Sequence, residues 1–320
     1  MKRLLSLLLG TALLAVLLAG CGGAPAGTED TPSEDAQTEP DTGDASLDNP
    51  RNQDGIGEKE LLVVSFGTSY NDNRRQTIGA IEEAMETAFP DYSVRRAFTS
   101  QIILDKVRDR DGVAMDNVQQ ALDRAVDNGV QTLIIQPTHL MNGLEYNELV
   151  DTAAQYADAF QHLAIGQPLL TDQADFDAVA AAITQATAQY DDGKTAICFM
   201  GHGTEADANT VYTTMQNLLT QQGYDNYYIG TVEAEPSLDT VLSAVQKGSY
   251  ERVVLLPLMI VAGDHANNDM AGDEADSWKS TFTAAGYEVE CLLTGLGELD
   301  AIQQLFVAHA QQAMDSLTAQ

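Results

Sequence analysis

Two histidines have the residue types and spacing needed for metal or proton chemistry. His202 lies between Gly201 and Gly203, and His265 follows Gly263 by two positions. Each loop comes directly after an apolar run that is typical of a buried parallel strand. We therefore expect both histidines at the carboxyl ends of strands, where open α/β sheets build their ligand sites. Imidazoles there can bind Co²⁺, Fe²⁺, Ni²⁺ or Zn²⁺, or transfer protons near neutral pH.

The elements that must position these histidines alternate along the chain from residue 59. Apolar runs of strand length are separated by stretches with helical periodicity, which predicts parallel strands joined by crossover helices. The predicted strands are 61–66, 92–98, 132–136, 163–165, 196–200, 226–231, 253–258 and 287–293. The clearest helical patterns are 117–126, 176–187, 213–219 and 238–245.

The strands fall into two sets of four that end in similar residues. Ile-Ile-Gln-Pro, ending at Pro137, matches Leu-Leu-Pro, ending at Pro257, and a Gly follows the first strand of each set. We predict an α/β fold with two similar doubly wound parallel-sheet halves, residues 59–170 and 171–320, facing a central cleft. Ligands in such arrangements bind between the halves.

The chain begins with a segment that resembles an export signal. Lys2 and Arg3 precede an apolar run, and Leu-Ala-Gly-Cys (18–21) is similar to a bacterial lipobox. Residues 1–21 are therefore interpreted as a lipoprotein signal peptide, which predicts an extracytoplasmic protein anchored to the cell membrane by a lipid on Cys21. The run is slightly short for a spanning helix, which needs about 20 residues; an uncleaved anchor is the alternative.

Acidic residues dominate the composition. The chain has 48 Asp and Glu against 16 Lys and Arg, for a net charge of −32. Nucleic acid is excluded as a partner, because phosphate binding needs clustered Lys and Arg. Part of the acidity lies in residues 22–58, which contain few large apolar side chains. We predict that this segment is a disordered tether whose carboxylates contact nothing specific.

The two remaining cysteines and the glycine-containing loop after the first strand indicate less about function. Cys198 and Cys291 both lie in apolar strands, so they are either two buried thiols or one disulfide, which an exported protein permits. The loop after the first strand, Gly-Thr-Ser (67–69), lacks the spacing of phosphate-binding glycine motifs. We therefore expect no nucleotide site.

Five motifs together resemble the anaerobic sirohydrochlorin cobaltochelatase family of the CbiK type. They are Leu-Val-Val-Ser-Phe-Gly-Thr-Ser-Tyr (62–70), Arg-Ala-Phe-Thr-Ser (96–100), His-Leu-Met-Asn-Gly-Leu-Glu-Tyr (139–146), Phe-Met-Gly-His-Gly (199–203) and Pro-Leu-Met-Ile-Val-Ala-Gly-Asp-His-Ala-Asn-Asn-Asp-Met (257–270). The resemblance runs from about residue 60 to the C-terminus. It implies a class II chelatase, a lyase that inserts a divalent metal into a tetrapyrrole such as sirohydrochlorin without ATP, as in cobalamin biosynthesis.

The resemblance also implies a metal site that is catalytic. The two histidines of the family fall on His202 and His265, and its glutamate, in Gly-x-Val-Glu, falls on Glu233. Co²⁺ is the implied substrate metal, with Fe²⁺, Ni²⁺ and Zn²⁺ as alternatives. Two imidazoles and one carboxylate suit such ions and leave coordination positions open for exchange. Glu233 has a second interpretation, as a turn carboxylate that caps the helix beginning near Ser237.

A flat, polycarboxylate macrocycle would need apolar and cationic neighbours. Candidates for an apolar wall are Phe66, Tyr70 and Phe98, with ordinary core packing as the alternative for Phe66. Candidate cations near the cleft are Arg96, Arg108 and Lys279. His139 is a further candidate for a functional role, with the alternative that the N-terminal half only shapes the pocket.

The sequence is compatible with three classes of function. The motif set favours a chelatase. An extracytoplasmic metal- or haem-binding protein on the same fold, without turnover, is the main alternative, and a ligand receptor that binds no metal is the third. The oligomeric state stays open, with a homo-oligomer among the options.

Overall fold

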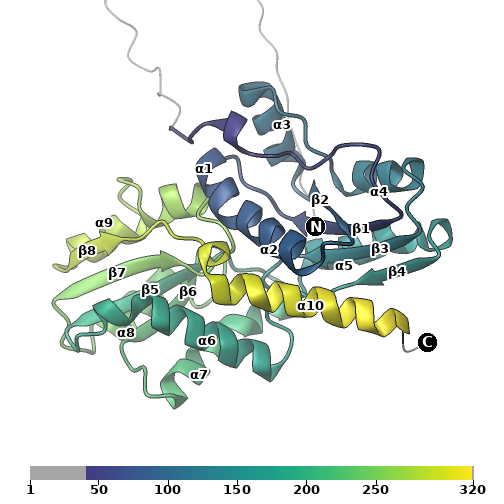
Figure 1. Ribbon diagram of the computed structural model, residues 1–320. Helices are drawn as coiled ribbons and strands as arrows, with labels where there is room; N and C mark the ends of the chain where they lie inside the picture. Colours follow the sequence, from purple (N-terminus) through teal and green to yellow (C-terminus); the bar gives the residue numbers. More distant parts are fainter. Residues whose placement is uncertain (1–40, 319–320) are drawn as a thin grey trace, which may run out of the picture. The chain divides into compact units, whose positions relative to one another are not determined.

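The predicted strands form two separate four-stranded sheets in a computed structural model that describes residues 41–318 (Figure 1). Every strand pair is parallel. The first sheet has the order β2-β1-β3-β4, with bounds β1 (Lys59–Ser65), β2 (Ser93–Phe98), β3 (Thr132–Pro137) and β4 (His162–Ile165). The second has the order β6-β5-β7-β8, with bounds β5 (Thr195–Gly201), β6 (Tyr227–Thr231), β7 (Arg252–Pro257) and β8 (Glu288–Cys291).

The equal strand orders confirm the prediction of two similar doubly wound halves. In each half the second strand pairs on one side of the first strand and the third strand pairs on the other. Successive strands are therefore added on opposite sides of β1 in the first sheet and of β5 in the second. Loops at the carboxyl ends of such strand pairs diverge, which leaves room for a ligand.

Helices connect the strands where the apolar periodicity predicts them. α4 begins after Asn117, whose side chain accepts from the Gln120 amide in a capping box, and α6 begins after Asp172 with the same motif. The bounds are α1 (Asn71–Arg74), α2 (Ala80–Ala88), α3 (Gln101–Asp111), α4 (Val118–Asp127), α5 (Leu144–Ala154), α6 (Gln173–Thr187), α7 (Thr210–Gln221), α8 (Leu238–Val245), α9 (Trp278–Ala284) and α10 (Asp300–Thr318). Short π-helical turns occupy Arg75–Gly79 and Ala266–Met270.

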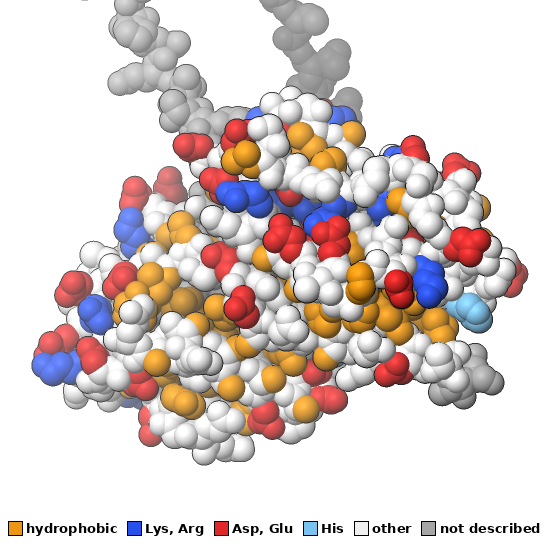
Figure 2. All heavy atoms as spheres, in the orientation of Figure 1, with side chains coloured by type: hydrophobic (Ala, Val, Ile, Leu, Met, Phe, Trp, Pro, Cys, Tyr) orange, Lys and Arg blue, Asp and Glu red, His pale blue; other side chains and the backbone are white. Residues whose placement is uncertain are grey.

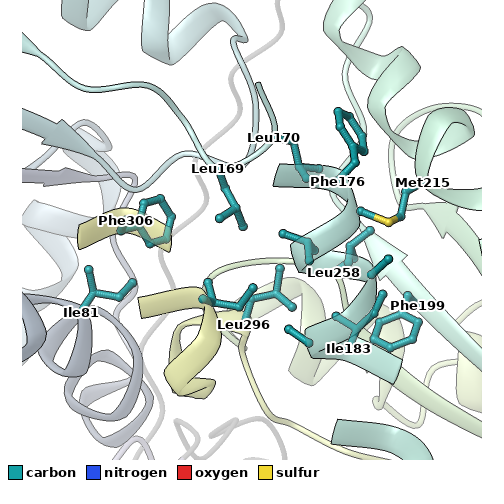
Figure 3. Packing of buried hydrophobic residues seen from close by; sticks show 14 of the residues in the cluster. Ile81, Leu169, Leu170, Phe176, Ile183, Phe199, Met215, Leu258, Leu296 and Phe306 are labelled. Carbon is teal, nitrogen blue, oxygen red and sulfur yellow. The ribbon is translucent and has the colours of Figure 1, made fainter. Parts of the chain in front are cut away.

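One hydrophobic core joins the two halves. The last helix, α10, contacts α2, β3 and β4 of the first half as well as α6 of the second (Figure 1). Figure 3 shows Phe306 of α10 in the same cluster as Ile81 of α2 and Phe199 of β5. The predicted boundary near residue 170 therefore separates two sheets, but it does not separate two independent cores.

The prediction of a disordered tether is wrong for residues 41–58. The side chain of Asp48 is only 5% exposed, and it accepts from Arg74 Nε at 2.6 Å and from Arg96 Nη1 at 2.7 Å. Arg51 is buried as well and pairs with Glu82 at 2.9 Å. The sequence pattern missed this because the segment is held by charge pairing, whereas disorder was inferred from its lack of apolar residues. Residues 22–40 lie outside the described part of the chain.

Strand register settles the pairing of the two cysteines. Cys198 of β5 and Cys291 of β8 lie opposite the same residue of β7, Leu255. Adjacent strands are about 4.8 Å apart, so the two cysteine Cα atoms are about 10 Å apart, beyond the reach of a disulfide. Both thiols are free.

The signal peptide and its Cys21 lie outside the described residues. Within residues 41–318, no helix combines the length and apolarity that crossing a bilayer requires. Figure 2 shows acidic side chains dispersed over the face drawn there, among apolar and neutral ones.

Candidate metal centre

His202 is held at the carboxyl end of β5 by two glycines that let other groups approach closely. A Cβ on Gly201 would lie 2.2 Å from the ring of Tyr212, and one on Gly203 would lie 2.8 Å from the Ala234 amide nitrogen. Gly203 also has a φ of +88°, which favours glycine. The Gly203 N–H donates to the buried Tyr212 hydroxyl at 3.2 Å. The Gly-His-Gly sequence is thus required by packing around the histidine.

Glu233 is brought beside His202 by an extension of the strand pairing. After β6 ends, the Val232 N–H donates to Gly201 O at 3.0 Å, and the Glu233 N–H donates to His202 O at 2.9 Å. His202 Nδ1 and Glu233 Oε2 are 3.8 Å apart. The carboxylate beside the start of the next helix is that of Glu235, not Glu233, because Glu235 Oε2 accepts from the Ser237 N–H at 2.9 Å.

His265 comes from the loop after β7, the strand next to β5. Its Nδ1 lies 2.8 Å from Asp269 Oδ2, one π-helical turn onward. The Asn267 side chain donates to the carbonyl oxygens of Ala262 at 3.1 Å and Gly263 at 2.8 Å, which closes the loop on itself. Sequence analysis missed Asp269, although its spacing of four residues from His265 was a usable signal.

The three side chains form a cluster open to solvent. The His202 and His265 ring centroids are 4.7 Å apart, with the rings nearly perpendicular at 86°. One ligand atom from each of His202, Glu233 and His265 lies within 4.8 Å of the others. Within residues 41–318, this is the one group of three or more His, Cys, Asp or Glu side chains close enough together to bind a metal ion. Between 33% and 55% of each side chain is exposed, so water and a larger ligand can reach it.

The hydrogen bonds of the two rings indicate which nitrogens are free. His202 Nδ1 lies 2.8 Å from Gly203 O, and a carbonyl oxygen requires an N–H donor. His265 Nδ1 faces a carboxylate in the same way. With both protons on Nδ1, each ring presents the Nε2 lone pair as its ligand. A carboxylate behind an imidazole also fixes the tautomer and the orientation of the ring.

The structure corrects the expected apolar wall. Phe66 is 48% exposed, as a ligand wall requires, but Tyr70 and Phe98 are buried. Phe98 packs in a cluster with Ile78 and Leu104. Its position at the end of an apolar strand did not distinguish a core aromatic residue from a surface one.

The structure also corrects part of the expectation about which cations are available to a substrate. Arg96 is buried and fully engaged by Asp48 and Glu82, so it is unavailable to a substrate. Arg108 is exposed and pairs with Asp105 and Asp109, whereas Lys279 is half-buried and pairs with Asp273.

His139 does not join the trio. Both of its ring nitrogens are buried without a hydrogen-bond partner among the described residues. Burial lowers the pKa of His139 to about 4, so the ring is neutral at physiological pH.

Two doubly wound sheets, with two imidazoles and a carboxylate open at one carboxyl edge, place the chain among the metal chelatases. The chain belongs to the cobalt chelatase (CbiK) family, whose sequence profile matches residues 59–315. The sirohydrochlorin cobaltochelatase of Salmonella typhimurium is 40% identical over 258 residues, which cover 81% of this chain and 97% of that protein.

Further similarities agree with this family. Sirohydrochlorin cobaltochelatase CbiKC of Nitratidesulfovibrio vulgaris is 32% identical over 279 residues, covering 85% of this chain and 97% of the relative. Among solved structures, SirB from Bacillus subtilis with Fe³⁺ has a TM-score of 0.56 at 14% identity, covering 81% of this chain and 97% of SirB. That likeness concerns the fold alone.

Proposed function

We propose that this chain inserts Co²⁺ into sirohydrochlorin, with His202, Glu233 and His265 as the residues that hold and deliver the metal. The observation that carries the proposal is the convergence of these three side chains from three loops of one sheet. Membership of the cobalt chelatase family and two relatives named as sirohydrochlorin cobaltochelatases support the choice of metal and tetrapyrrole. Fe²⁺, Ni²⁺ and Zn²⁺ suit the same ligands.

The chemistry follows from a site that is only half closed. Three protein ligands leave coordination positions for water, so pyrrole nitrogens can replace the water one at a time. Insertion of a divalent ion releases two pyrrole N–H protons. As the metal leaves its protein ligands, the freed lone pairs of the two imidazoles and the Glu233 carboxylate become proton acceptors beside the departing ion. The same three residues therefore deliver the metal and take up the protons.

The test is an anaerobic assay of the purified full-length protein with sirohydrochlorin and limiting Co²⁺. The visible spectrum of the tetrapyrrole reports insertion, and the His202→Ala/His265→Ala double variant is the comparison. We expect catalysed insertion by the wild type, lost in the variant. If the wild type binds Co²⁺ tightly without accelerating insertion, the protein is a metal-binding protein on a chelatase fold.

We also propose that the protein works outside the cytoplasm, attached to the cell membrane through a lipid on Cys21. The support is the lipobox-like sequence at 18–21. Metabolic labelling with a radioactive fatty acid tests it. We expect label and membrane association in the wild type, and neither in the Cys21→Ser variant; an unlabelled wild type would contradict the proposal.

A further inference from the structure

Residues 41–58, here called the strap, pack on the body although they precede residues 59–315, which match the profile of the family. The Asp72 N–H donates to Thr42 O at 2.9 Å, and Asn71 Nδ2 donates to Gly43 O at 3.1 Å. Both donors belong to the short helix α1. The strap therefore lies directly against one side of α1.

Arg74, the last residue of α1, links the strap to the loop after β1. Its side chain is fully buried. It donates to Asp48 Oδ2 at 2.6 Å, to Thr68 O at 3.1 Å and to Asn71 Oδ1 at 2.6 Å. One guanidinium thus connects the strap, α1 and the Thr68 loop, and a buried cation of this kind requires its anion.

The other side of α1 contacts the loop that carries His265. Asn73 Oδ1 accepts from the Ala262 N–H at 2.8 Å, and Asn73 Nδ2 donates to Glu298 Oε1 at 3.4 Å. Ala262 is buried, so its N–H needs a protein acceptor. These bonds cross from the first half of the chain to the second.

Packing reinforces the same contact. A Cβ on Gly263 would lie 3.1 Å from Thr68 Oγ1, so the two loops touch. Val261 packs against the apolar cluster of the first half that contains Ile78 and Phe98. The chain from Val261 to Gly263 is held by the first half, and His265 follows two residues later.

We infer that α1 positions the His265 loop, with Asn73 as the positioning residue and the strap, through Asp48 and Arg74, as its support. His202 and Glu233 are placed by strand pairing inside the second sheet, whereas the loop that leads to His265 is held by the other half as well. The separation of the two imidazoles is then set by contacts between the halves. The consequence for metal binding rests on the proposed function; the positioning of the loop does not.

The test uses the full-length protein with Co²⁺ alone as the probe, followed by the visible absorption of the bound ion. We expect Asn73→Ala to weaken Co²⁺ binding about tenfold and to alter the spectrum, because His265 shifts away from its partners. Asp48→Asn is expected to act in the same direction. Hydrogen exchange of the Ala262 amide gives a second readout, which should become faster in both variants.

Two further variants separate positioning from general destabilisation. The swap Asn73→Asp/Glu298→Gln restores an acceptor for Ala262 and a hydrogen bond between the two side chains, and should recover Co²⁺ affinity. His309→Ala removes a buried contact between α10 and Asp175 of α6 and should lower the unfolding temperature without changing Co²⁺ affinity.

Wild-type Co²⁺ affinity and wild-type exchange at Ala262 in Asn73→Ala would overturn the inference while leaving the proposed function intact. Absence of Co²⁺ binding by the wild type would instead refute the proposed function. The exchange rate at Ala262 would then decide the positioning of the loop by itself.

Discussion

Gly203 determines how close the Glu233 loop comes to His202. Its positive φ and the short approach of the Ala234 amide both exclude a side chain. We expect Gly203→Ala to reduce Co²⁺ affinity about tenfold or more by displacing Glu233, in addition to a loss of about 1–2 kcal/mol from the left-handed backbone. Calorimetric titration with Co²⁺ and thermal unfolding measure the two effects.

Gly223→Ala is the matched control for this prediction. Gly223 has a φ of +90°, and a Cβ there would meet nothing within 4 Å. This variant should show the backbone penalty and keep full Co²⁺ affinity. Equal Co²⁺ affinity in the two variants would contradict the proposed role of Gly203.

Asp269 orients His265 through the bond to Nδ1. Asp269→Ala removes both the acceptor and the negative charge, and we expect Co²⁺ affinity to fall about 10- to 100-fold. Asp269→Asn keeps an acceptor and should lose less. The prediction fails if the two variants bind Co²⁺ equally in the same titration.

At the scale of elements, β1 carries a buried carboxyl that makes stability depend on pH. Glu60 is 2% exposed, and burial raises its pKa to about 7, with Arg95 opposing the shift. Between about pH 4.5 and 7 the unfolded chain loses this proton while the folded protein keeps it. The free energy of unfolding therefore falls as pH rises, by up to about 3 kcal/mol.

Glu60→Gln removes this titration. Urea unfolding at a series of pH values should show the variant gaining stability relative to the wild type from pH 4.5 to 7, and no further change above pH 8. Parallel stability curves for the two proteins would rule out the predicted contribution of Glu60.

At the scale of the whole molecule, α10 packs on both halves, and we expect them to unfold as one cooperative unit. Phe306 is fully buried in the cluster that contains residues of both sheets. We expect Phe306→Ala to lower the free energy of unfolding by about 3–5 kcal/mol. Far-ultraviolet circular dichroism reports both halves, and the fluorescence of Trp278, the sole tryptophan, reports the second.

Both probes should shift to the same lower urea midpoint. Ile102→Ala is the control, because Ile102 is 78% exposed, and its effect should stay within about 0.5 kcal/mol. Separate midpoints for fluorescence and circular dichroism in the wild type would show that the halves unfold independently.

Local patterns in the sequence determined most of the fold. The sequence predicts all eight strands because apolar runs of strand length are bounded by turns. The similar residues at the strand ends of the two sets indicate two similar halves. His202 and His265 were found because each directly follows such a run. Glu233 was found through its family motif, because a single carboxylate in a turn carries no comparable local signal.

Tertiary structure decided what depends on residues far apart in the sequence. The strap folds because Asp48 meets Arg74 and Arg96, Tyr70 and Phe98 are core residues, and the register of β5, β7 and β8 separates the cysteines. The contact of Asn73 with Ala262 joins helix α1 to a loop that lies 189 residues further along the chain. Strand and helix periodicity report only on neighbouring residues, whereas burial and charge pairing are set by which distant segments meet.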